Sequence, residues 1–212
     1  MNCKIVSMFN DSHLKLHEVS KKSIKHFCDL SGISCDFFRI PSDFERPPAW
    51  YKIKVILDLL KTYDGYIIWM DADSVIHNND VNIESYLDEN KLYLVRDFNN
   101  INTGFFIVKT CQEIIDFFEK AWSLTEYVDA RGCQPIGQWE QKAIIRLYDD
   151  NYLECQSFTK ELDQDIFNSY PMEYYGQDKN FKGDISDKSF TCHFPSLSLS
   201  TRLNLMKKHS NA

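Results

Sequence analysis

Short apolar runs alternate with helical apolar patterns along most of the chain. Residues 4–9 are an apolar stretch of strand length, and residues 35–40 are a second one. Between them, apolar residues recur at the spacing of one helix face: Leu16, Val19, Ile24, Phe27 and Leu30. The order strand, helix, strand predicts that the chain opens with a βαβ unit.

The same alternation continues through the middle of the chain. A polar, proline-containing loop at residues 41–48 leads into a helical pattern that we expect Gly65 to end. The apolar positions of this pattern are Trp50, Ile53, Ile56, Leu57 and Leu60. Residues 66–70 then form a continuous apolar run typical of a buried strand, and further strands are expected at 92–95 and 104–108.

Two more helical patterns follow the last of these strands. Their apolar positions are Ile114, Ile115, Phe118 and Trp122 in the first, and Trp139, Ala143 and Leu147 in the second. Beyond residue 151 the pattern weakens, and Arg202, Lys207 and Lys208 indicate a basic C-terminal tail. Alternating strands and helices predict an α/β fold with a mostly parallel central sheet flanked by helices. A chain of 212 residues fits one full core, so we predict a single domain over residues 1–212.

The net charge and the lengths of the apolar runs exclude some classes of binding partner. Acidic residues outnumber basic ones 31 to 24, and the net charge of −7 argues against nucleic acid or an anionic membrane surface. No apolar run approaches the roughly 20 residues that a membrane-spanning helix needs. The apolar stretch at residues 5–9 is also shorter than the signal-peptide core of about 7–15 residues. We therefore expect no transmembrane segment and no signal peptide.

The cysteines favour a reducing compartment. There are seven, an odd number, and no two are spaced as a C-x-x-C pair. This pattern indicates neither a disulfide framework nor a zinc site. A cytoplasmic location is the expectation, either for a whole protein or for one domain of a longer chain.

Asp71 and Asp73 directly follow the apolar run at residues 66–70. The spacing alone says little, because Asp163 and Asp165 repeat it. The position is more informative, since open α/β sheets bind ligands at the carboxyl ends of their strands. Two carboxylates there suit a hard divalent cation that leaves coordination positions free for phosphate oxygens. The alternative is that these acidic residues cap the segment that follows.

Six segments in order resemble the GT-A fold glycosyltransferases. They are Trp50-x-Lys52, residues 63–73, Asn102-Thr103-Gly104, Trp139-Glu140-Gln141, Asn168-Ser169-Tyr170-Pro171 and His193-Phe194. In this order they are most similar to the galactosyl/mannosyltransferase family of fungal and plant xylosyl- and galactosyl-transferases, and more weakly to glycogenin-like enzymes. The small size and the lack of an anchor also resemble bacterial and large-virus enzymes, including the amino-terminal domains of algal-virus (chlorovirus) glycosyltransferases.

The resemblance implies a metal-dependent transferase that moves a hexose or deoxyhexose from a UDP-sugar donor to a glycan or glycoprotein acceptor, with retention. It implies that Asp73 and His193 bind Mn²⁺ or Mg²⁺, and that Asp71 binds either the metal or the ribose. A nitrogen ligand beside carboxylates favours Mn²⁺. Residues 1–100 would form the nucleotide-binding part, and residues 101–212 the acceptor and catalytic part.

The resemblance also implies residues around the transferred sugar. Glu140 and Gln141 would lie beside the reacting carbon, and Asn102 would face the donor sugar. Asp97, at the end of the preceding strand, is a similar candidate for sugar hydroxyls. Glu140 would be the general base of an inverting enzyme, or would steady an oxocarbenium-like state in a retaining one, and spacing does not decide between them. A glutamate in the first turn of a helix also simply favours the helix dipole.

The nucleotide is expected at the first strand and its turn. By analogy with nucleotide-binding folds, Ser7, Phe9 and Asn10 would hold the base and ribose, with Ala72 beside them. Lys52 could reach the diphosphate, although a solvated lysine fits an amphipathic helix equally well. Arg202 or Lys207 could do the same from the tail, and a solvated tail is the simpler interpretation.

Two other functions remain open. A haloacid-dehalogenase-type, Mg²⁺-dependent phosphatase also carries Asp-x-Asp after an apolar strand, with the first aspartate as nucleophile. That class usually has the motif on its first strand, whereas a βαβ unit precedes it here. The second alternative is a non-catalytic, metal-dependent sugar-binding module, which would bind glycan without nucleotide.

Overall fold

The computed structural model describes residues 1–128, 139–177 and 182–212. At its centre lies a six-stranded sheet in the order β2-β1-β3-β6-β5-β7. The strands are β1 (Cys3–Phe9), β2 (Ser34–Arg39), β3 (Tyr66–Met70), β5 (Leu92–Arg96), β6 (Ile101–Lys109) and β7 (Thr159–Leu162). Only β6 runs antiparallel to its neighbours β3 and β5, and the other pairs are parallel. The predicted α/β fold with a mostly parallel sheet is confirmed.

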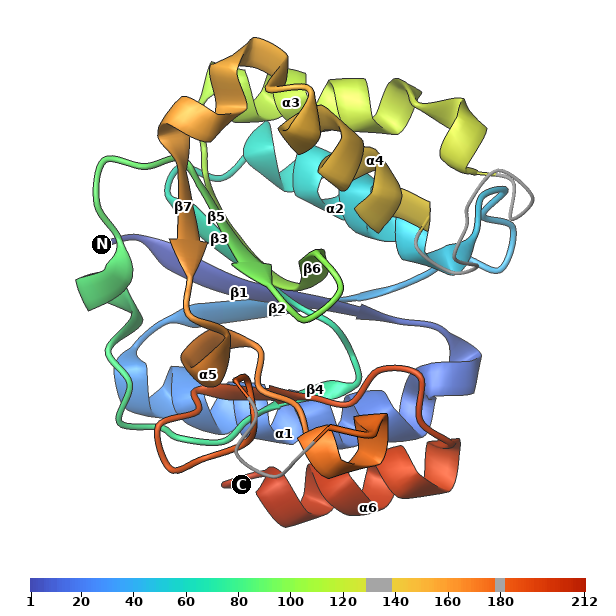
Figure 1. The fold of residues 1–212 in the computed structure, drawn as a ribbon, viewed down its shortest axis with the longest axis vertical. Helices are drawn as coiled ribbons and strands as arrows, with labels where there is room; N and C mark the ends of the chain where they lie inside the picture. The colour runs from blue at the N-terminus through green and yellow to red at the C-terminus, as the bar shows by residue number, and fades with distance from the viewer. Residues whose placement is uncertain (129–138, 178–181) are drawn as a thin grey trace.

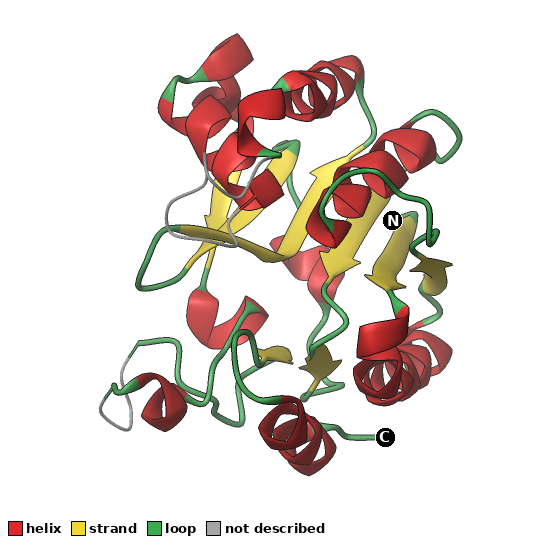
Figure 2. Ribbon diagram, turned by 90° about the vertical axis from the view of Figure 1, so that its right-hand side faces the viewer, coloured by secondary structure: helices red, strands yellow, loops and turns green. Residues whose placement is uncertain are grey.

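Helices cover both faces of this sheet (Figures 1 and 2). On one face lie α2 (Tyr51–Leu60), α3 (Gln112–Ser123) and α4 (Trp139–Asp149). On the other face lie α1 (Leu14–Ser31), α5 (Gln164–Phe167) and α6 (Leu199–His209). Short 3-10 helices connect them: η1 (Asp11–His13), η2 (Pro48–Trp50), η3 (Ile83–Tyr86), η4 (Thr125–Tyr127), η5 (Tyr152–Phe158) and η6 (Met172–Tyr175).

The central strands are apolar on both faces because both faces are covered. In β3, Ile67 and Trp69 join the core cluster beneath α2, α3 and α4. Their neighbours Ile68 and Met70 join the opposite cluster, with residues of α1 and α5. This strict alternation follows from the two-residue period of a strand and explains the continuous apolar run in the sequence.

Gly65 has a different role from the one that the helical pattern predicted. The helix α2 ends at Leu60, and Gly65 opens β3 with a φ of +147°. A Cβ atom at this position would collide with the backbone oxygen of Asn2. The glycine is therefore needed for the close approach of two chain segments.

The sequence patterns missed several elements beyond residue 73, among them β7, α5, two three-residue strands and the last helix. The strands β4 (Ser74–Ile76) and β8 (Thr191–His193) pair antiparallel, with Ser74 opposite His193. The predicted C-terminal tail is wrong, because α6 is a helix capped by Ser198 that buries Leu205 and Met206. The strand expected at 104–108 begins three residues earlier, at Ile101, so Asn102 lies within it.

None of the described helices is both long and apolar enough to cross a membrane. The six cysteines within the described residues carry free thiols. Cys133 lies outside the described residues.

Candidate active site

A cavity of about 770 Å³ opens at the carboxyl ends of β1 and β3. Because β6 runs antiparallel to β3, its first residues meet these ends at the same edge of the sheet. The cavity is lined by Phe9, Asn10, Lys52, Asp71, Ala72, Asp73, Asp97, Asn102, Glu140, Gln141 and His193, all of them sequence-predicted. Ser7 is the exception, since it is fully buried and does not line the cavity.

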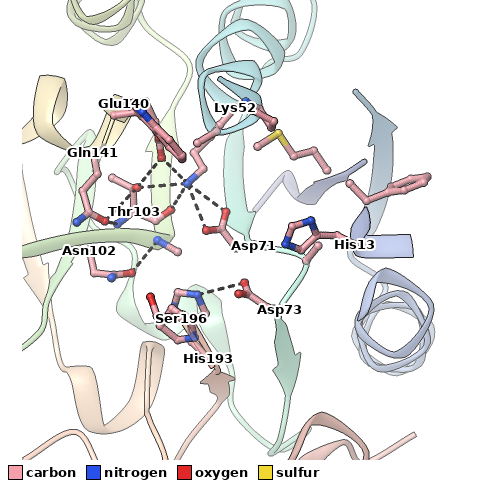
Figure 3. A pocket seen from close by; sticks show the side chains of 18 of the residues that line it. His13, Lys52, Asp71, Asp73, Asn102, Thr103, Glu140, Gln141, His193 and Ser196 are labelled. Atoms are coloured by element: carbon pink, nitrogen blue, oxygen red, sulfur yellow. Dashed lines mark hydrogen bonds and ion pairs between the residues drawn. The ribbon is translucent and has the colours of Figure 1, made fainter. Parts of the chain in front are cut away.

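Asp71, Asp73 and His193 converge on one point of the cavity (Figure 3). One ligand atom from each residue lies within 4.8 Å of the others. Asp71 and Asp73 flank the turn from β3 into β4, and His193 ends β8. The pairing of β4 with β8 therefore brings together residues that are far apart in the sequence.

The carboxylate of Asp73 lies between the imidazole of His193 and the guanidinium of Arg202. Its Oδ1 is 3.3 Å from Nε2 of His193, and its Oδ2 accepts a hydrogen bond from Nη1 of Arg202 at 3.1 Å. Burial opposes ionisation, but His193 and Arg202 outweigh it and hold the pKa of Asp73 well below its ordinary value. Asp73 is thus a carboxylate at neutral pH and can ligate a cation.

The ring of His193 is oriented from both sides. Nδ1 of His193 lies 3.0 Å from Oδ1 of Asn168, whose amide donates to Oδ1 of Asn102. Since Nδ1 donates to Asn168, Nε2 either donates to Asp73 or gives its lone pair to a cation that both side chains share. Gly104 makes room for this ring, because a Cβ atom there would collide with Cε1.

Lys52 is the centre of a buried charge network next to the candidate ligands Asp71, Asp73 and His193. Its Nζ lies 3.1 Å from Oδ1 of Asp71 and 3.0 Å from Oε1 of Glu140. It also donates to the backbone oxygen of Thr103 at 2.8 Å. Burial alone would lower the pKa of Lys52, but Asp71 and Glu140 raise it above its ordinary value.

This network corrects one interpretation of the sequence. The Lys52 side chain is 2% exposed, so it is not a solvated lysine on an amphipathic helix. Its ammonium group links the metal-binding end of the cavity to Glu140. The side chain of Glu140 is 5% exposed, and its Oε1 also accepts from Oγ1 of Thr103.

Asp71 is held by Lys52, by Trp69 and by the backbone of Gly104. Besides Lys52, Nε1 of Trp69 donates to Oδ1 of Asp71 at 2.7 Å. The backbone N–H of Asp71 donates to the oxygen of Gly104, which holds the motif against β6. Asp71 therefore has a rigid position, with a side chain that remains 28% exposed to the cavity.

Polar groups from three segments meet on the β5–β6 side of the cavity. Oδ2 of Asp97 accepts from Nδ2 of Asn102 at 3.1 Å and from the hydroxyl of Tyr170 at 2.9 Å. Oε1 of Gln141 accepts from the backbone N–H of Thr103 at 3.0 Å, which leaves its Nε2 as a donor for a ligand. This wall thus offers several directed hydrogen bonds.

The opposite end of the cavity is formed by the turn after β1. Oδ1 of Asn10 caps η1 by accepting from the backbone N–H of His13 at 3.0 Å. Phe9, His13 and Ile40 line this end. The structure therefore provides an apolar and amide-lined recess at the turn where the base and ribose were expected.

Sequence patterns missed several residues of this site. Thr103 and Trp69 lie within the recognised segments but were given no role, because a threonine or tryptophan in a strand is ordinary core composition. His13 lines the cavity but belongs to no recognised segment. Arg202 was interpreted as part of a solvated tail, whereas its side chain is 18% exposed and paired with Asp73. Lys207 is exposed and does not line the cavity.

No family model matches the sequence, and no curated protein matches it. Solved structures do match. The chain is similar to a glycosyltransferase involved in the glycosylation of the major capsid of PBCV-1, with 16% identity and a TM-score of 0.74. That match covers 98% of this chain and 100% of the other. The chain has the GT-A fold.

Two further solved structures support this assignment of the fold. The galactosyltransferase LgtC matches with 12% identity and a TM-score of 0.60, over 99% of this chain and 96% of that one. The glycosyltransferase GlyE of Streptococcus pneumoniae TIGR4 matches with 15% identity and a TM-score of 0.59. This match covers 99% of this chain and 60% of the GlyE chain. The resemblance to GT-A glycosyltransferases that the six segments carried is therefore confirmed.

Proposed function

We propose that the chain is a metal-dependent glycosyltransferase that moves a hexose or deoxyhexose from a UDP-sugar to a glycan or glycoprotein acceptor. The observation that carries the proposal is the convergence of Asp71, Asp73 and His193 in one cavity, next to the buried pair of Lys52 and Glu140. The GT-A fold supports it. A glycoprotein acceptor is supported by the likeness to the glycosyltransferase involved in glycosylation of the PBCV-1 capsid.

The three ligand residues fit a divalent cation. Two carboxylates and one imidazole favour Mn²⁺ over Mg²⁺, and Nε2 of His193 already faces Asp73. Bound there, the cation would supply the positive charge that offsets the negative charge of the leaving diphosphate. Arg202 contributes a second positive charge on the same side.

The cavity divides between the two halves of the chain. Phe9, Asn10 and Ala72, within residues 1–100, would hold the nucleotide at the turn after β1. Asn102 and Gln141, within residues 101–212, would hold the transferred sugar with the help of Asp97. The donor would then span the cavity from the β1 turn to the start of β6.

The surroundings of Glu140 favour retention. Its Oε1 already accepts from Nζ of Lys52 and Oγ1 of Thr103, so this oxygen is not free to take a proton from an acceptor hydroxyl. A fixed carboxylate of this kind can instead stabilise positive charge that develops on the sugar ring. Glu140 would therefore act through Oε1 as an electrostatic partner of the reacting sugar, and only its other oxygen, Oε2, could serve as a general base.

Calorimetric titration with UDP, GDP and CMP, each with and without Mn²⁺, tests this function. We expect UDP to bind, and to bind only in the presence of the metal. The substitution Asp73→Asn should abolish that binding while leaving the fold intact, because it removes the charge and keeps the shape of the side chain. Unchanged affinity in this variant would refute the metal assignment.

The second Asp-x-Asp pair offers a matched control. Asp163 is exposed and caps α5 by accepting from the backbone N–H of Asp165. Asparagine caps helices about as well as aspartate, so Asp163→Asn should alter neither stability nor nucleotide binding. An equal loss of binding in both variants would point to an effect of overall charge instead of a specific site.

A further inference from the structure

We propose a second metal site, for a zinc-like cation, on the face of the small β4–β8 sheet that is turned away from the cavity. Its ligands are His77, Cys192 and His209, and one ligand atom from each lies within 4.8 Å of the others. The three residues come from separate segments: His77 follows β4, Cys192 lies in β8, and His209 is the last residue of α6.

Strand geometry separates this site from the catalytic one. Cys192 and His193 are neighbours in β8, and successive side chains of a strand point to opposite faces. His193 faces the cavity, whereas Cys192 is fully buried in the cluster that α6 forms with α1 and β4. One three-residue strand would thus serve two metal sites, one on each face.

The donor set specifies the kind of cation. A thiolate and two imidazoles favour Zn²⁺ and disfavour the hard cations that suit the carboxylates on the other face. Zinc bond lengths of about 2.0–2.3 Å with tetrahedral angles need ligand atoms roughly 3.3–3.7 Å apart. The three side chains would therefore have to close by at most about 1.5 Å. Binding would form a bond from zinc to Sγ of Cys192 and release the thiol proton to solvent.

Both histidines are prepared for this role. Nδ1 of His77 lies 2.8 Å from the backbone oxygen of His209, so the proton of a neutral ring is held on Nδ1 and Nε2 keeps its lone pair. The ring of His209 lies beside that of His77, with the two ring centroids 5.5 Å apart. In the described part of the chain, the ring nitrogens of His209 have no hydrogen-bond partner.

Such a cation would attach α6 to the small sheet. The rest of α6 is held by Leu205 and Met206, and the helix carries Arg202 to Asp73. Among the described residues, three protein ligands are available, and both histidines are half-buried, which leaves a fourth position for water. The cation would therefore join α6 to the small sheet through three protein ligands and keep one position open to solvent.

Titration of the chelator-treated full chain with Co²⁺ and Zn²⁺ tests the proposal. Co²⁺ bound to a thiolate gives a charge-transfer absorption that carboxylate and imidazole ligands do not produce, so the signal reports a cysteine ligand and ignores the catalytic site. We expect this band in the wild type and in Asp73→Asn, and we expect Zn²⁺ to displace it and raise the melting temperature. Absence of the band in the wild type would overturn the proposal.

Two variants and one control complete the test. His209→Gln, at the half-buried end of α6, should keep the fold and weaken Zn²⁺ binding at least about tenfold, the lower end of what loss of a supporting group costs. Cys192→Ala should remove the charge-transfer band, whereas Cys155→Ala, at an equally buried cysteine, should retain it. A band that survives Cys192→Ala, or Zn²⁺ affinity unchanged in His209→Gln, would refute the site.

Discussion

Single side chains decide how the charges of the cavity are balanced, and Lys52 is the most important of them. Its ammonium is the shared partner of Asp71 and Glu140 in a place that water scarcely reaches. Removing one member of such a group leaves buried charges uncompensated, which costs more than the pair itself contributes. The lysine is therefore needed for both stability and chemistry.

Replacing Lys52 by methionine tests this role. We expect a loss of about 3 kcal/mol in the free energy of unfolding, measured with urea, and loss of transferase activity. The double variant with Glu140→Gln should lose less than the sum of the two single changes, because one of the two uncompensated carboxylates is gone.

The exposed Lys54, two residues along the same helix, is the control. It forms an ion pair with Asp58 in which both side chains are about half exposed. Lys54→Met should cost less than about 0.5 kcal/mol. Equal losses at both positions would mean that burial of Lys52 carries no special cost.

A second prediction at this scale concerns Gly104. Alanine at this position would push the ring of His193 away from Asp73, because its Cβ atom would overlap the imidazole. We expect Mn²⁺-dependent affinity for UDP to fall at least tenfold in Gly104→Ala, measured by calorimetry. Gly32→Ala, at the left-handed end of α1 with open space around it, should reduce stability by about 1 kcal/mol and leave affinity unchanged.

At the scale of helices and strands, an element could be predicted from the sequence when it was long enough to show a clear apolar period. The strand at residues 66–70 was predicted with its observed bounds, because five consecutive apolar residues are a strong signal. The strands β4 and β8 have three residues each, which is too few to show an alternation of apolar and polar residues. The helix α6 is mostly polar, with few buried positions, so its pattern resembled a solvated tail.

A buried histidine where α1 packs on the sheet predicts that the free energy of unfolding depends on pH. His17 of α1 stacks on Phe9 of β1, with ring centroids 3.8 Å apart, and burial with help from Lys21 lowers its pKa to about 4. Above pH 6.5 the ring is neutral in both folded and unfolded chains, so it adds no pH dependence. Between pH 6.5 and 4 the unfolded chain binds the proton first, and stability must fall as the pH falls.

The variant His17→Phe should lose less stability as the pH falls, measured as the free energy of unfolding in urea between pH 4 and pH 8. His209 titrates over the same range, so part of the slope will remain. His26, exposed on the same helix, is the matched control, and His26→Gln should leave the slope unchanged. The same slope in the wild type and in His17→Phe would show that burial of this ring does not affect stability.

At the scale of the whole molecule, the order and direction of the strands bring the residues of the site together. Its residues range from Phe9 to Arg202, and they meet because β1, β3 and β6 share one edge while β8 returns beside β4. Sequence similarity could single out Asp71, Asp73 and His193 as candidate ligands, but the pairing of Lys52 with Glu140 depends on how α2 and α4 pack. The contact of Arg202 with Asp73 depends in the same way on α6.

The most direct test of the proposed transferase is donor turnover followed by NMR. The purified chain would be incubated with a panel of UDP-sugars, with Mn²⁺ or with a chelator, and the anomeric proton of the released or transferred sugar would be observed. We predict that one UDP-sugar is consumed only when Mn²⁺ is present, and that the first product keeps the anomeric configuration of the donor. Failure to consume any UDP-sugar, together with metal-dependent hydrolysis of a phosphate monoester, would contradict the account and favour a phosphatase.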